Sequence, residues 1–76
     1  INRSRLEQGI NPAELFAELG LTGSRGEAKR LIKQGGLYIN DQRIDSLERW
    51  VNENDLTPEG ILLRSGRKKY HRVLAK

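Results

Sequence analysis

The chain has 76 residues, of which 36% are hydrophobic, so it can build one small domain and no more. Fourteen Lys and Arg against ten Asp and Glu give a net charge of +4 and favour a polyanionic partner. The absence of cysteine excludes disulfides, thiolate metal sites and a cysteine nucleophile, and a reducing cytoplasm fits best. No apolar run approaches the ~20 residues that a bilayer-spanning helix needs, so we expect no membrane contact.

Residues 1–9 are mainly polar and show no apolar period. They include Arg3, Arg5 and Glu7, and the chain starts at Ile1 rather than at a methionine. We therefore expect residues 1–10 to be a linker, residues 11–76 to be the folded domain, and the whole chain to be a piece of a longer protein.

A first helix is predicted over residues 12–19. Asn11 can cap the free amides at its start, and Pro12 fits the first turn. Apolar residues then recur at three- and four-residue spacing until Gly20, which ends the helix. Among them, Phe16 is expected in the core, because buried aromatic residues outnumber exposed ones in small folds.

A second helix is predicted over residues 25–34. Ser24 and Glu27 have the spacing of a capping box, and Gly35 and Gly36 end the helix. Its apolar residues share one face, and at ~100° per residue its cations occupy the adjoining face. These cations are Arg25, Lys29, Arg30 and Lys33.

A hairpin is predicted after this helix, because residues 37–40 alternate as a strand does. Tyr38 should face away from its neighbours Leu37 and Ile39, towards solvent or a nucleobase. Asn40 and Asp41 are turn residues, and the chain returns through residues 43–44.

Residues 47–56 are expected to be a loop with a short strand or a turn of helix, and Trp50 is expected to pack into the core. A closing hairpin follows over residues 61–74, with Arg67, Lys68 and Lys69 at its tip and Tyr70 beside them. The sequence thus predicts an α+β fold in which two short helices pack on a small, mostly antiparallel sheet.

The sequence offers no constellation for catalysis or metal binding. Its single histidine, His71, lies between Tyr70 and Arg72 and has no histidine partner, so we expect a structural or RNA-contacting role. The glycines around residue 23 follow no strand, as a dinucleotide site would require. We therefore expect no cofactor and no catalytic residue in this chain.

The positive charges gather in two stretches, residues 25–33 and 64–72, which hold nine of the fourteen. Glu27 is the single acid in them, whereas acids crowd the segment between. We therefore expect one electropositive side, suited to phosphates. A basic helix face is often only solvated, but Tyr70 and His71 beside the second stretch could stack on bases or hydrogen-bond and favour RNA.

Residues 12–56 resemble the RNA-binding domain family named for ribosomal protein S-four, also called the alpha-L motif. The resemblance rests on Leu15 and Leu19, on the run from Ser24 to Ile32 with Gly36, and on Tyr38-Ile39-Asn40, Val51 and Asp55-Leu56. In that family the second helix and the following hairpin form an electropositive surface for structured RNA. The implied contacts are Ser24, Arg25, Lys29, Arg30, Lys33, Tyr38 and Asn40, to which the closing hairpin adds Arg67, Lys68, Lys69 and Tyr70.

Residues 61–74 narrow the resemblance, because they look like the closing hairpin of tyrosyl-tRNA synthetases. This implies a carboxy-terminal domain that grips the long variable arm and anticodon region of tyrosine tRNA, with no DNA partner. ATP and tyrosine would bind a catalytic domain outside this chain, through which the parent would form a homodimer. Asp41 departs from the family, which often has glycine there, so the hairpin tip could differ.

Two alternatives would leave the fold unchanged. The chain could be the amino-terminal module of a pseudouridine synthase, which presents RNA to a separate catalytic domain. It could also be a free-standing or ribosome-associated protein that binds ribosomal RNA.

Overall fold

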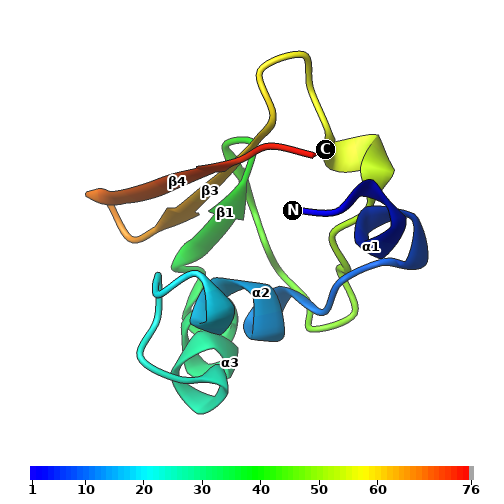
Figure 1. Ribbon diagram of the computed structural model, residues 1–76. Coiled ribbons are helices and arrows are strands. Elements are labelled where there is room, and N and C mark those ends of the chain that lie inside the picture. Colours follow the sequence, from blue (N-terminus) through cyan, green and yellow to red (C-terminus); the bar gives the residue numbers. More distant parts are fainter. Residues whose placement is uncertain (76) are drawn as a thin grey trace.

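The computed structural model describes residues 1–75, and its helices pack against one face of a single sheet (Figure 1). In Figure 1, α2 and α3 lie below the sheet, and α1 lies beside them near both chain ends. The elements in order are α1 (Arg3–Gln8), α2 (Pro12–Glu18), α3 (Arg25–Gln34), β1 (Leu37–Ile39), β2 (Gln42–Arg43), the 3-10 helix η1 (Glu53–Asp55), β3 (Ile61–Ser65) and β4 (Lys69–Val73).

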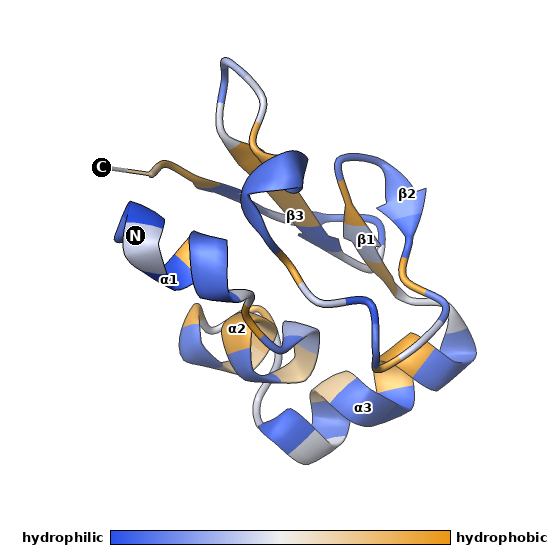
Figure 2. Cartoon of the chain, turned by 90° about the vertical axis from the view of Figure 1, so that its right-hand side faces the viewer, coloured by the Kyte–Doolittle hydropathy of each residue, from blue (hydrophilic) through white to orange (hydrophobic). Residues whose placement is uncertain are grey.

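The sheet has the strand order β2-β1-β3-β4, and every neighbouring pair is antiparallel. Alternate residues are buried: Leu37 and Ile39 on β1, and Ile61 and Leu63 on β3. Figure 2 shows hydrophobic residues along both strands, with α2 and α3 on one side of the sheet. The predicted α+β fold is confirmed.

Local capping signals place α2 and α3 where the sequence predicts them. Oδ1 of Asn11 accepts the N–H of Ala13 at 2.9 Å, and Oγ of Ser24 accepts the N–H of Glu27 at 3.1 Å. Helix α3 ends at Gly35 in the left-handed conformation, with φ of 76°. Phe16 is fully buried, as expected.

The first ten residues differ from the linker that we expected. They contain α1, which Asn2 caps, and Leu6 on this helix is fully buried in the core. Ile10 then pairs with Val51 through two backbone hydrogen bonds of 2.7 and 2.9 Å. A six-residue helix with a single buried apolar residue shows no period in the sequence, which is why the pattern predicted a linker.

Trp50 was also predicted wrongly, because 46% of its side chain is exposed. Its neighbour Val51 takes the core position and pairs with Ile10, which turns Trp50 outwards against Gly9. The predicted turn of helix in this loop is present as η1, closed by a capping box between Asn52 and Asp55.

The β1–β2 turn has both central residues, Asn40 and Asp41, at positive φ, 49° and 66°. This is the backbone that a two-residue hairpin demands, and Asp41 adopts it without being glycine. No helix within residues 1–75 is long and apolar enough to cross a membrane.

Candidate nucleic-acid interface

Helix α3 buries Ala28 and Ile32 and presents its cations to solvent. Lys29, Arg30 and Lys33 are exposed, and none of the ion pairs within residues 1–75 involves them. Arg25 is exposed too and forms only a long ion pair of 3.7 Å with Glu14. These side chains are therefore free to reach phosphates.

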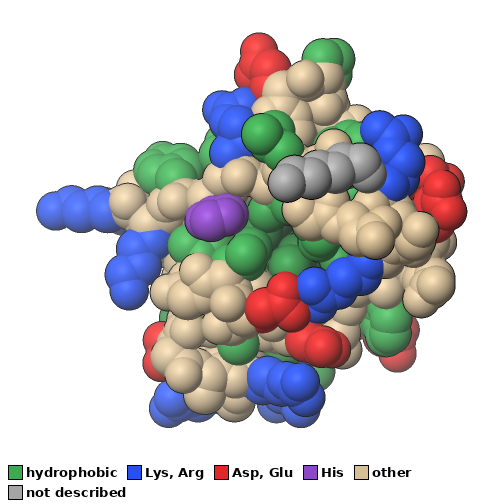
Figure 3. All heavy atoms as spheres, viewed as in Figure 1, with side chains coloured by type: hydrophobic (Ala, Val, Ile, Leu, Met, Phe, Trp, Pro, Cys, Tyr) green, Lys and Arg blue, Asp and Glu red, His purple; other side chains and the backbone are tan. Residues whose placement is uncertain are grey.

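The tip of the β3–β4 hairpin lies beside the end of α3. The backbone N–H of Gly66 donates to the carbonyl oxygen of Gly36 at 2.8 Å, two residues after α3 ends. Arg67, Lys68 and Lys69 follow directly and are exposed. Figure 3 shows Lys and Arg side chains at the free end of the hairpin and at the lower end of the molecule, where α3 lies.

Arg43 adds a cation that the sequence patterns did not single out. It pairs with Tyr38 across β1 and β2, and its side chain lies against Gly35, where a Cβ would meet Cδ of Arg43 at 3.0 Å. Lys33, Gly35 and Arg43 line one shallow cavity. The sequence pattern did not indicate this position because Arg43 reaches the end of α3 only through the register of β1 and β2 and the turn that follows α3.

Tyr38 and Tyr70 lie on the sheet face turned away from the core. Tyr38 is half-buried, as its alternation with Leu37 and Ile39 predicted, and Tyr70 is 53% exposed. Arg64, which the RNA-contact prediction left out, lies between them, and its guanidinium carbon is 3.8 Å from the centroid of the Tyr38 ring.

Asn40 has a role inside the fold rather than on the candidate interface. Its Nδ2 donates to the carbonyl oxygen of Asp55 at 2.7 Å, and its Oδ1 accepts the N–H of Leu62 at 2.9 Å. These bonds hold both ends of the side-chain amide, so we leave Asn40 out of the RNA surface. Ser24 also has a role in the fold, because its side chain caps the start of α3.

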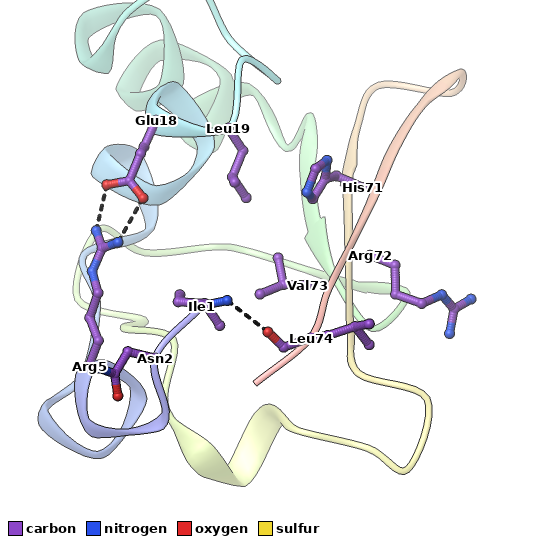
Figure 4. Close-up of a pocket in the computed structure, with 9 residues that line it drawn as sticks. All are labelled: Ile1, Asn2, Arg5, Glu18, Leu19, His71, Arg72, Val73 and Leu74. Carbon is purple, nitrogen blue, oxygen red and sulfur yellow. Dashed lines mark hydrogen bonds and ion pairs between the residues drawn. The ribbon is translucent and has the colours of Figure 1, made fainter. Parts of the chain in front are cut away.

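His71 lines a cavity of about 490 Å³ between α1, α2 and β4 (Figure 4). Figure 4 shows His71 on the side of β4 that faces Leu19, whereas Arg72 points away. Arg5 and Glu18 close one wall with an ion pair of 2.6 Å, and their hydrogen bond lowers the pKa of Glu18 and raises that of Arg5. Glu18 is the one acid among the described residues that line this cavity, and Arg5 already holds its carboxylate.

Within the described residues, no group of three or more His, Cys, Asp or Glu side chains is placed to hold a metal ion. The exposed cations are therefore the main chemical feature of the surface. They suit an anionic polymer.

Residues 2–73 match the family model described as the tyrosine–tRNA ligase SYY-like C-terminal domain. The chain is 45% identical over 74 residues to the tyrosine–tRNA ligase of Desulfatibacillum aliphaticivorans, covering 97% of this chain and 17% of that protein. It is 45% identical over 73 residues to the enzyme of Desulfosudis oleivorans and 41% identical over 68 residues to that of Caldanaerobacter subterraneus, covering 96% and 90% of this chain. It spans 17% of each of these two relatives as well.

Proposed function

This chain belongs to the family of SYY-like C-terminal domains of tyrosine–tRNA ligases, and we propose that it grips the long variable arm and anticodon region of tyrosine tRNA. The ligase names of the relatives favour this function over a pseudouridine synthase module or a ribosomal RNA-binding protein. The parent protein is then a tyrosine–tRNA ligase of the cytoplasm. Its ATP and tyrosine bind a catalytic domain outside this chain, through which it forms a homodimer.

The observation that carries the proposal is the backbone hydrogen bond from Gly66 to Gly36, which joins the hairpin tip to the end of α3. This bond joins the segment just before the second group of cations to the end of the helix that carries the first group, although the two groups lie more than thirty residues apart in the sequence. An RNA stem presents two phosphate ridges with a deep, narrow major groove between them. Lys33 and Arg30 on α3 can meet one ridge while Lys68 and Lys69 meet the other.

This contact reads the shape of the stem rather than its sequence. Lysine side chains on phosphates carry no base information, and the major groove of an A-form stem is closed to side chains. The start of α3 adds the free amides of its first turn, which favour a phosphate beside Ser24. Specificity then follows from where the stem stands on the tRNA body.

The test compares two single substitutions, each of which removes one positive charge. Lys33→Gln lies in the proposed surface, whereas Arg3→Gln lies on α1, outside both groups of cations. We expect Lys33→Gln to lower the slope of log affinity against log salt by somewhat less than one for tyrosine tRNA. Arg3→Gln should leave the slope as it is. Equal slopes for Lys33→Gln and the unchanged chain would place α3 outside the interface.

A further inference from the structure

Tyr38, Arg64 and Tyr70 form one row across three strands. Tyr38 on β1 is the direct partner of Arg64 on β3, and Arg64 is the direct partner of Tyr70 on β4. Direct cross-strand partners point to the same face of a sheet. Because Leu37, Ile39 and Leu63 fill the other face, this row lies on the face turned away from α2 and α3.

The guanidinium of Arg64 is stacked but has no anionic partner. It lies 3.8 Å from the centroid of the Tyr38 ring, and no carboxylate within residues 1–75 forms an ion pair with it. Its Nε is buried without a hydrogen-bond partner. Buried donors of a purely structural arginine are normally paired, so the guanidinium without an anionic partner favours a role in binding an external ligand.

Tyr70 completes a stacking surface. Its ring centroid is 6.0 Å from the guanidinium carbon of Arg64, farther than that of Tyr38, and about half of its surface is exposed. Arg72, two residues along β4 on the same face, is exposed and pairs with Glu59 at 3.3 Å. The row therefore combines the exposed ring of Tyr70 with a planar cation that is already stacked on Tyr38.

This combination fits an unpaired nucleobase. A phosphate alone gains nothing from the tyrosine rings, and a base inside a paired stem has no free face to offer. An unpaired base can stack on an aromatic ring or a guanidinium plane while its phosphates meet the neighbouring cations. We propose that the Tyr38–Arg64–Tyr70 row stacks an unpaired base of the bound RNA.

The inference rests on the proposed RNA binding and adds a second kind of contact to it. The row lies on the face of the sheet turned away from α3, and two features connect it to the end of α3. One is the hairpin tip, and the other is Arg43, the direct partner of Tyr38, whose side chain lies against Gly35. The site is therefore suited to a junction at which a paired stem meets unpaired nucleotides.

The test uses an RNA hairpin labelled with fluorescein at one end and carrying 2-aminopurine in its unpaired loop, next to the stem. Fluorescein anisotropy reports binding, and quenching of 2-aminopurine reports stacking. The 76-residue chain should bind and quench. Tyr70→Leu should lose most of the quenching and bind this RNA roughly tenfold more weakly, because it removes the aromatic ring on which the base stacks. Its affinity for a fully paired duplex should not change.

Two control variants separate stacking from other effects. Tyr70→Phe keeps the ring and should quench as the unchanged chain does. Trp50→Leu removes an exposed aromatic residue elsewhere on the surface and should quench equally well. Binding without quenching, or equal quenching by Tyr70→Leu, would overturn this inference and leave the proposed function standing. A lack of any anisotropy change with this hairpin would also overturn the inference, whereas the proposed function depends on the binding of tyrosine tRNA itself.

Discussion

Oδ1 of Asn40 accepts the backbone N–H of Leu62 at 2.9 Å, and the backbone N–H of Asn40 donates to the carbonyl oxygen of Leu62 at 2.7 Å. The side chain thus continues the β1–β3 ladder after β1 has turned away. It also ties the turn to Asp55, fifteen residues along the chain. This one amide therefore connects the β1–β2 turn to both β3 and η1.

Replacing Asn40 by Ala should therefore lower the free energy of unfolding by about 2 kcal/mol, because the N–H of Leu62 and the carbonyl of Asp55 lose their partners. Urea unfolding measures this. Asn54→Ala is a suitable control, since that residue is exposed and lies in the same loop region as Asp55. A midpoint equal to that of the unchanged chain would show that the amide contributes nothing to the fold.

Ser24→Ala should lower the free energy of unfolding by ~1 kcal/mol, because Oγ of Ser24 caps the N–H of Glu27. It should also weaken phosphate binding at the start of α3. Ser24→Asn keeps a capping oxygen and should restore most of the stability. Thermal melts of the three proteins measure these differences. An Ala variant that melts at the same temperature as the unchanged chain would show that this cap does not stabilise α3.

Leu6→Ala should lower the free energy of unfolding by roughly 2–5 kcal/mol, the range for truncating a buried leucine. Leu6 is fully buried, although it lies in the segment that the sequence pattern predicted as a linker. Leu74→Ala removes the same atoms from a side chain that is 60% exposed and should cost far less. Similar losses for the two variants would mean that α1 does not belong to the folded unit.

The ion pair between Arg5 and Glu18 should make stability depend on pH on the acid side. Its hydrogen bond holds the pKa of Glu18 below the ordinary value of 4.5. A lowered pKa contributes stability above the unfolded value, and that contribution is lost as the pH falls through the folded value. The pair is more than a third exposed, so the effect should stay below ~1 kcal/mol.

As the pH is lowered from roughly 6 to 3, the free energy of unfolding of Glu18→Gln should therefore fall by less than that of the unchanged chain. Glu48→Gln, at an exposed carboxylate that forms no ion pair within residues 1–75, controls for the change in net charge. Urea unfolding at both pH values measures the difference. An identical pH dependence for Glu18→Gln and the unchanged chain would show that the pair does not stabilise the fold.

The sequence predicted those features whose signals are local. Asn11 and Ser24 mark the starts of α2 and α3 because a cap needs only residues within one turn. The exposed stripe on α3 follows from helical periodicity alone. The overall α+β fold follows from these helices and the alternation in the strands.

The features that were missed depend on partners far along the chain. Trp50 and Val51 are both apolar, and only the pairing of Val51 with Ile10 decides which of them is buried. Asn40 looks like an ordinary turn residue until β3 brings Leu62 to its side chain. Arg64 becomes a stacking residue only when the strand register sets it beside Tyr38.

Recognition of the long variable arm is tested most directly by fluorescence titration of this chain with four kinds of tRNA at one near-physiological salt concentration. At low salt, any basic domain binds any tRNA. Tyrosine tRNA with its long arm should bind more tightly than a tRNA with a short variable loop, and deletion of the arm should remove most of the difference. Base-pair exchanges that keep the arm paired should matter little. Equal affinity for the long-arm and short-arm tRNAs would contradict the proposed function.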